Sequence, residues 1–346
     1  MKLLFSIAVV VAAAGGTQVW DWSTADDELS SGSGFASSKE ICRKVRDREP
    51  PAEDAPSAAE AAALKGCSSE ALYYGIGVKA DPVKARQCAL LELREKRDDS
   101  VFSGRTMLMT IYANGVGARR DLDLATHFAC GIEGAPMESH GRVSHLSELK
   151  AEGWTGRDFH FCDDITSGYA GGFCAAHKAG IKGGKREAEL AAIVARWKPA
   201  ERQAFESLRQ AHAAFAEAHG SGEIDLSGTL RGAMVVDAEE ALRDELLEMV
   251  KALEAGRAPR LGAADFRAAD AALNAGYRKF LASEAVGGDY PGAVTREGVR
   301  GAQRAWLRYR DAFLAFAALR YPQLGRDGLA AWLTRKRTKM WEAEEN

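Results

Sequence analysis

The clearest hydrophobic pattern in the chain lies in the sequence VRGAQRAWLRYRDAFLAF, residues 299–316. Its apolar side chains recur at alternating intervals of three and four residues, which is typical of an α-helix with one buried face. These positions are Val299, Ala302, Trp306, Tyr309, Phe313 and Phe316. Tyr321-Pro322 follows, and a proline favours the end of a helix just before it. The segment predicts a long amphipathic helix that packs against other helices.

Four other segments of the C-terminal half have a similar pattern. Pro199 suits the first turn of a helix, and Gly256 suits the position just after one. The apolar positions of these segments are Phe205, Leu208, Phe215, Leu242, Leu246, Met249, Leu253, Phe266, Leu273, Tyr277, Phe280, Leu329, Leu333 and Met340. Aromatic side chains in such stripes are more often core than ligand-binding. We therefore predict an all-α fold whose second half is a helical bundle.

All six cysteines lie in the first half of the chain, between Cys42 and Cys174. A length of 346 residues is sufficient for two domains with separate cores. The uneven distribution of cysteine indicates a cross-linked N-terminal domain and a C-terminal domain that depends on its core alone. If the chain is exported, these cysteines lie in an oxidising compartment, where disulfides persist.

Residues 1–16 have the features of a secretory signal peptide. Lys2 precedes the apolar run LLFSIAVVVAAA, and small residues suitable for cleavage lie near Ala14 and Gly16. The run is too short for a permanent transmembrane helix, and no later stretch approaches the roughly 18 apolar residues of a membrane span. No cysteine closely follows the run, so a lipid anchor has no support. We predict a periplasmic or secreted protein without a transmembrane anchor.

Residues 17–59 have the composition of a flexible linker. They include the Ser/Gly-rich sequence SSGSGFASS and the acidic, Pro-containing sequence DREPPAEDAP. We expect little order in this segment apart from the neighbourhood of Cys42.

Two segments between residues 60 and 150 share one pattern and begin 40 residues apart. Residues 75–85, GIGVKADPVKA, and residues 115–125, GVGARRDLDLA, each contain a Gly-x-Gly turn, an Asp that can cap a helix and a later Ala. This pattern resembles the Sel-one-like repeat, a relative of the tetratricopeptide repeat. The resemblance implies a short helical-repeat domain over residues 60–150, made of antiparallel helix pairs that act as a binding scaffold.

The expected hairpin around the first Gly-x-Gly turn also predicts a disulfide. Cys67 and Cys88 lie at similar sequence distances before and after this turn. Antiparallel helices would bring the two cysteines alongside each other. We therefore predict that Cys67 pairs with Cys88.

A second pair of cysteines lies in the sequence HFCDDITSGYAGGFCAAH, which runs from His160 to His177. Cys162, Cys174 and the two histidines could together bind zinc in tetrahedral geometry. In an exported protein, a disulfide that closes a short loop is the favoured interpretation. We predict a Cys162–Cys174 disulfide and no metal.

The C-terminal half carries a second family resemblance. Residues 271–281, AALNAGYRKFL, contain a Leu-Asn…Tyr pattern, and residues 302–313, AQRAWLRYRDAF, contain Gln-x-x-Trp-Leu-x-x-Arg-Asp. With EIDLSGTLRG at 223–232 and FCAAHKA at 173–179, these sequences resemble the LprI type of lysozyme inhibitor over residues 160–341. The resemblance implies a helical exported domain, some members of which bind and inhibit lysozyme. The late cysteines and the lipid-anchor cysteine of that family are absent here.

Charge is balanced overall but uneven along the chain. The 46 Lys and Arg residues against 49 Asp and Glu residues give a net charge of −3, which argues against a dedicated nucleic-acid binder. Residues 237–254 carry seven acids and two bases, and residues 296–339 carry eleven bases and three acids. These oppositely charged helices could simply be solvated neighbours.

Two sets of charged residues are nevertheless candidate contact surfaces. The acids Glu240, Asp244 and Glu248 could meet a cationic partner such as lysozyme. Four arginines repeat every four residues on one helix face and could meet an anionic envelope polymer or protein. They are Arg296, Arg300, Arg304 and Arg308.

Catalytic motifs are missing from the sequence. It contains no HExxH, no G-x-S-x-G and no dinucleotide fingerprint, and the sequence GIKGGKR at Gly180 lacks the glycine spacing of a phosphate loop. We predict a non-enzymatic binding protein of the bacterial envelope that needs no cofactor and binds lysozyme or another envelope protein. The alternative is a helical-repeat scaffold for protein contacts without lysozyme inhibition.

Overall fold

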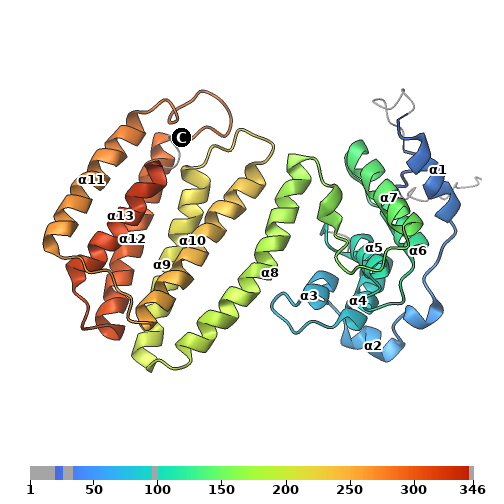
Figure 1. Ribbon diagram of the computed structural model, residues 1–346, viewed down its shortest axis with the longest axis horizontal. Helices are drawn as coiled ribbons and strands as arrows, with labels where there is room; N and C mark the ends of the chain where they lie inside the picture. Colours follow the sequence, from blue (N-terminus) through green and yellow to red (C-terminus); the bar gives the residue numbers. More distant parts are fainter. Residues whose placement is uncertain (1–19, 26–33, 96–99, 343–346) are drawn as a thin grey trace, which may run out of the picture.

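The computed structural model describes residues 20–25, 34–95 and 100–342. These residues form thirteen α-helices and two short 3-10 helices (Figure 1), and their only β-type pairing is an isolated bridge between Val286 and Val294. The predicted all-α fold is therefore confirmed. The α-helices are α1 (Ala36–Val45), α2 (Ala58–Ala63), α3 (Ser69–Tyr74), α4 (Pro82–Glu95), α5 (Gly104–Asn114), α6 (Leu122–Cys130), α7 (Pro136–Ala151), α8 (Gly168–Val194), α9 (Pro199–Gly222), α10 (Arg231–Glu254), α11 (Ala263–Ala282), α12 (Arg296–Arg320) and α13 (Arg326–Glu342).

The long helix predicted from residues 299–316 is α12. Its N-cap residue Thr295 accepts a hydrogen bond from the backbone N–H of Gly298 at 3.0 Å, and the helix ends immediately before Tyr321. All six apolar positions of the predicted stripe are buried. Burial of one large apolar side chain stabilises a fold by roughly 1.5–3 kcal/mol, so this stripe holds α12 firmly in the bundle.

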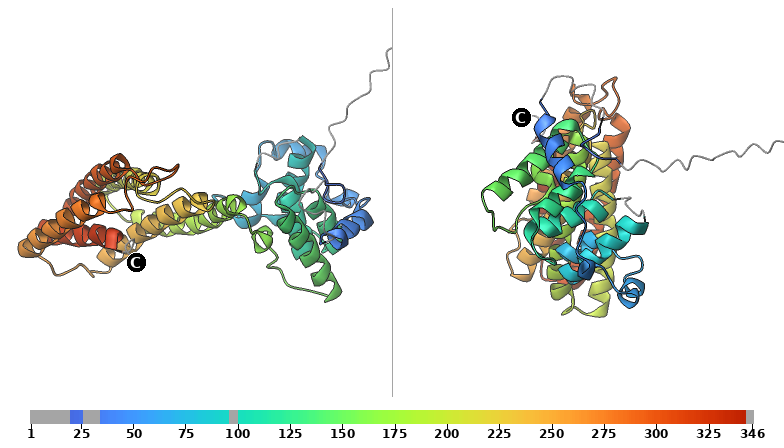
Figure 2. Two further views of the ribbon diagram at one scale, coloured as in Figure 1. Left: turned by 90° about the horizontal axis from the view of Figure 1, so that it is seen from above. Right: turned by 90° about the vertical axis from the view of Figure 1, so that its right-hand side faces the viewer.

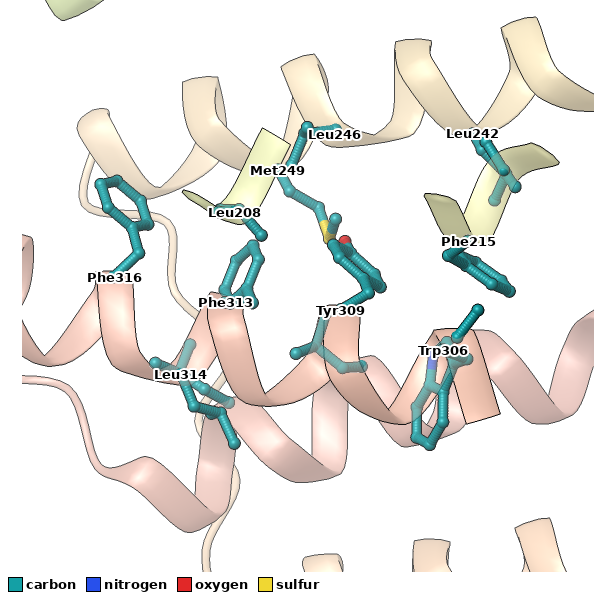
Figure 3. Packing of buried hydrophobic residues seen from close by; sticks show 14 of the residues in the cluster. Leu208, Phe215, Leu242, Leu246, Met249, Trp306, Tyr309, Phe313, Leu314 and Phe316 are labelled. Carbon is teal, nitrogen blue, oxygen red and sulfur yellow. The ribbon is translucent and has the colours of Figure 1, made fainter. Parts of the chain in front are cut away.

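The C-terminal core lies between α12 and the helices that it faces. Figure 3 shows Tyr309 and Phe313 directed toward side chains of α9 and α10. The rings of Phe215 and Tyr309 stack with an interplanar angle of 6°. The helix α11 packs mainly on α13, and α10 packs on α8 and α9. The predicted bundle is thus a helical assembly with one continuous apolar cluster.

A second apolar cluster forms the core of the N-terminal half. It includes fully buried residues of α5, among them Met107 and Leu108, and Phe128 of α6. The α8 helix connects the two halves: Cys174 packs against the N-terminal cluster, whereas Leu190 belongs to the C-terminal cluster. Figure 2 shows the resulting elongated arrangement, with the two halves at opposite ends of the molecule.

The two Gly-x-Gly segments form the turns that their sequences predict. Gly75 ends α3 with φ of 75°, and Gly115 ends α5 with φ of 62°. Glycine adopts these left-handed conformations without a Cβ clash. Asp121 then caps α6 by accepting from the backbone N–H of Leu124 at 2.9 Å. The structure therefore contains helix pairs α3/α4 and α5/α6, while the Sel-one-like classification itself stays a prediction.

Three disulfides cross-link the N-terminal half and the start of α8. The predicted pairs Cys67–Cys88 and Cys162–Cys174 are both confirmed. Cys42–Cys130 is the third pair, and it joins α1 to the end of α6. No cysteine remains free.

Among the described residues of 17–59, order extends beyond the neighbourhood of Cys42, where alone it was expected. Residues 36–45, around Cys42, form α1, and Trp22 is only 2% exposed. The backbone N–H of Trp22 donates to the carbonyl of Cys130 at 2.8 Å, and its indole N–H donates to Ser38 Oγ at 2.9 Å. Tertiary packing, together with the Cys42–Cys130 disulfide, thus orders a segment of loop-like composition. The signal-peptide prediction lies outside the described residues.

Candidate functional site

The α12 arginine face consists of Arg296, Arg300, Arg304 and Arg308, and all four side chains are exposed. Arg304 forms an ion pair with Glu297 at 2.7 Å. In the part of the chain that the structure describes, no acidic side chain forms an ion pair with the other three. This face therefore presents positive charge to the surroundings of the protein.

The α10 acidic edge consists of Glu240, Asp244 and Glu248, and its charges are largely compensated within the molecule. Both Glu240 oxygens accept hydrogen bonds from Arg186 of α8, at 2.7 and 3.0 Å. Arg186 also donates to Asp244 at 2.9 Å, and Lys182 forms a further ion pair with Asp244. Glu248 forms an ion pair with Lys251 at 3.0 Å, but its side chain is 65% exposed. Glu248 is therefore the most accessible charge of this edge.

The pKa values of the acidic edge agree with this pairing. Burial would raise the pKa of Glu240, but hydrogen bonds from Arg186 and Arg243 outweigh burial and lower it. For Asp244, burial is likewise outweighed by Lys182 and Arg186, and the pKa is lowered. Both carboxylates remain charged near neutral pH as partners of α8. The sequence placed the acidic residues on one helix but could not reveal that their partners lie on α8 and not on α12.

The histidines of the segment from His160 to His177 form a hydrogen-bonded chain at the junction between the two halves. The backbone N–H of Cys162 donates to His160 Nδ1 at 3.0 Å, so this nitrogen carries no proton. His160 Nε2 then donates to His177 Nε2 at 3.0 Å, and His177 Nδ1 donates to Glu70 of α3. His160 is therefore neutral, with its proton on Nε2. Burial and the neighbouring His177 also lower the pKa of His160.

The Cys162–Cys174 disulfide removes the zinc alternative, because it occupies both sulfurs that would have to bind the metal as thiolates. No cluster of three or more potential ligand side chains suited to a metal occurs among residues 20–25, 34–95 and 100–342. The segment instead attaches the start of α8 to α3.

A buried ion pair that the sequence analysis did not identify lies inside the bundle. Arg337 of α13 donates to both oxygens of Glu223, at 2.9 and 2.6 Å, and both side chains are 0% exposed. His219 and the Trp341 indole also bond Glu223, at 2.9 and 3.3 Å. In the sequence of α13, Arg337 lies between the apolar positions Leu333 and Met340. A charged residue within such an apolar stripe was the sequence feature that could have indicated a buried ion pair.

A surface groove lies between α10, the loop before α11, and α13. It has a volume of about 550 Å³, and we call it the α13 groove. Its lining includes Glu245, Leu261, Trp332, Arg335, Lys336, Lys339 and Met340. The sequence analysis assigned no role to these residues, because the groove depends on the packing of helices that are distant in sequence.

Comparison with known proteins identifies one family in the C-terminal part of the chain. Residues 255–340 match the family model described as lysozyme inhibitor LprI. The match spans α11 and α12 and nearly all of α13, about a quarter of the chain. No curated protein and no solved structure matches the chain.

The described residues include no helix that is both long enough and apolar enough to cross a membrane. The three disulfides fit an extracytoplasmic location, because such bonds persist in oxidising compartments. The matched segment is likewise similar to a family of inhibitors and not to a family of enzymes.

Proposed function

We propose that this chain is an exported, non-enzymatic protein that binds lysozyme, or a related wall-degrading enzyme, through its C-terminal bundle. The observation that carries the proposal is the match of residues 255–340 to the lysozyme inhibitor LprI model. These residues form three long helices whose apolar sides are buried together, and their outer faces are available for contacts. The proposed location is the periplasm or the extracellular space.

The charge distribution supports a particular orientation for such a partner. Lysozyme is commonly cationic, so the α12 arginine face would repel it. On the α10 acidic edge, Glu240 and Asp244 serve as internal partners of Arg186, whereas Glu248 projects outward. We therefore place the lysozyme contact near Glu248. The α12 arginine face remains the candidate surface for an anionic envelope polymer or protein.

Titration of the chain lacking residues 1–16 with lysozyme tests the proposal. Calorimetry should detect saturable binding, and lysis of a cell-wall suspension should fall as the complex forms. Full lytic activity at saturation would exclude inhibition but leave binding intact. Absence of any binding would contradict the proposed function.

Charge reversal tests the position of the contact. Glu248→Lys should weaken lysozyme binding about two- to fivefold, because an exposed charge at an interface contributes roughly 0.2–1 kcal/mol. Glu297→Lys is the matched control, because Glu297 is an exposed acid at the start of α12 and is 72% exposed. We expect this control to bind lysozyme as tightly as the unmodified chain does. Equal weakening by both changes would contradict the assignment to Glu248.

The second candidate is a helical-repeat scaffold without lysozyme inhibition. The observation that favours it is the pair of helix hairpins α3/α4 and α5/α6, which lies outside the matched segment. Under this alternative, the bundle caps the repeats and the partner docks on the N-terminal half. Lysozyme would then neither bind nor lose activity, and changes at Glu248 would have no effect on partner binding.

A further inference from the structure

The α13 groove has the size and the stable walls of a small-molecule site. Its volume of about 550 Å³ lies within the range of ligand pockets, roughly 300–1,000 Å³. The loop that forms one wall is held against the start of α13. A Cβ atom at Gly328 would lie only 2.4 Å from the carbonyl oxygen of Leu261, so glycine permits this close approach. The groove is therefore part of the packed structure of the bundle.

An aromatic ring and aliphatic side chains give the groove an apolar surface. Trp332 is partly buried, and its ring packs edge-on against the core residue Phe313 with the centroids 6.4 Å apart. Leu261 and Met340 also line the groove. The Trp332 ring is thus fixed by the core, while the groove still reaches it. Such a surface favours a ligand with an apolar face.

The polar side chains of the groove carry more positive than negative charge. Arg335, Lys336 and Lys339 line it together with a single carboxylate, that of Glu245. Lys336 forms an ion pair with Glu245 at 3.3 Å, and Arg335 forms one with Asp265 at 2.7 Å. Lys339 is exposed and has no acidic partner among the described residues. Lys339 is therefore the cation available to an incoming anion.

We propose that the α13 groove binds an acidic sugar. The carboxylate of the ligand pairs with Lys339, and the C–H face of the sugar ring lies on the apolar surface around Trp332. The hydroxyl groups of the sugar supply donors that Glu245 can accept. An aromatic carboxylic acid could also pair with Lys339 and lie on the surface around Trp332, but it has no hydroxyl group to donate to Glu245. This inference goes beyond lysozyme binding and does not depend on it.

Two sugars that differ in one acidic substituent provide the test. N-acetylmuramic acid carries a lactyl carboxylate on a ring that is otherwise that of N-acetylglucosamine. Binding to the chain lacking residues 1–16 is measured by calorimetry and by chemical shifts of the indole N–H groups. We expect the acidic sugar to bind about tenfold more tightly, as a charge-assisted hydrogen bond allows. Equal binding of the two sugars, or no binding of either, would overturn the proposal.

Variants of the groove then separate a specific site from general attraction by a basic surface. Lys339→Gln should reduce the affinity for N-acetylmuramic acid to that for N-acetylglucosamine, whereas Arg326→Gln should leave it unchanged. Arg326 is the matched control, because it is an exposed cation on α13 outside the groove. Unchanged binding by the Lys339 variant would contradict the assignment.

The stacking contact has its own pair of variants. Trp332→Phe keeps a flat ring and should retain most of the affinity, whereas Trp332→Leu should lose it. Circular dichroism checks that both variants keep their helical content. Benzoate is the competing probe: binding of benzoate as tight as that of the acidic sugar would overturn the sugar assignment in favour of an aromatic acid.

Discussion

The two halves of the molecule stabilise similar helical architecture by different means. The N-terminal half contains helices as short as six residues, α2 and α3, and three disulfides link it together and to the start of α8. The C-terminal half, α9–α13, contains no cysteine and consists of helices of 17–25 residues around one apolar cluster. Short helices are marginal without tertiary support, whereas long amphipathic helices bury enough surface to stabilise each other. Covalent links thus add to the apolar core where the helices are short.

Reduction of the disulfides should produce the largest difference in stability between the two halves. The bonded cysteines lie 88, 21 and 12 residues apart. Loop-closure entropy alone gives roughly 3–5 kcal/mol for each such bond, although nested loops are not additive. We expect a reductant to abolish the protection of α1–α7 in hydrogen exchange measured by mass spectrometry.

The same experiment contains its control, because α9–α13 should keep their protection in the reduced protein. A Cys162→Ser/Cys174→Ser variant should lose protection mainly at η3 (Phe161–Asp164) and at the start of α8. Loss of protection throughout the bundle on reduction would show that its stability depends on the cross-linked half.

The second prediction concerns the buried ion pair of the C-terminal half. Arg337→Met should destabilise the bundle by about 3–5 kcal/mol, because it leaves the buried Glu223 carboxylate without its main cation. Burial would raise the pKa of Glu223, and Arg337 is the principal group that outweighs it and lowers the pKa. Urea unfolding followed by circular dichroism measures the change.

The double variant Arg337→Met/Glu223→Leu is the control for that prediction. It should recover much of the lost stability, since two apolar side chains leave no buried charge. A single variant that costs less than about 1 kcal/mol would contradict the ion pair's structural role.

Local patterns were sufficient to predict the helices of the bundle and two disulfides. The positions Trp306 and Phe313 are buried as their spacing predicts, because a helical stripe is set by neighbours in sequence. Cys67 and Cys88 meet because one short turn separates their helices. These features depend on residues that are close in the chain.

The features that local patterns did not predict depend on contacts between distant residues. Trp22 is held in place by hydrogen bonds to Ser38 and to the carbonyl of Cys130. The composition of the linker-like segment does not indicate these contacts. Arg337 and Glu223 are 114 residues apart, and an acidic edge on α10 could be identified without its partner Arg186. The charged residues of the candidate sites can therefore be read from the sequence, whereas the partners that compensate them are revealed only by the fold.

The smallest expected effect is a pH dependence that arises inside the bundle. His212 is 4% exposed, and its Nε2 donates to the carbonyl of Leu242 at 3.1 Å. Burial, with smaller contributions from Arg243 and Arg186, lowers its pKa from 6.5 to about 4. The unfolded chain then binds more protons than the folded protein between these values, so stability is full above about pH 6.5 and falls as pH decreases toward 4.

A pKa difference of this size corresponds to roughly 3 kcal/mol in total, of which about 2 kcal/mol is lost between about pH 7.5 and pH 5. The carboxylates with lowered pKa values, such as Glu240, lose their contribution to stability only below their ordinary pKa near 4.5. A change in stability above pH 5 therefore arises from histidine.

The variant His212→Gln, with its disulfides oxidised, keeps a side-chain donor for the carbonyl of Leu242. Its stability in urea unfolding should therefore depend less on pH than that of the unmodified chain. His160→Gln is the control, because His160 also has a lowered pKa but lies in the cross-linked N-terminal half. This variant should leave the pH dependence of the bundle's stability unchanged. An unchanged pH dependence in His212→Gln would assign the acid sensitivity to groups other than His212.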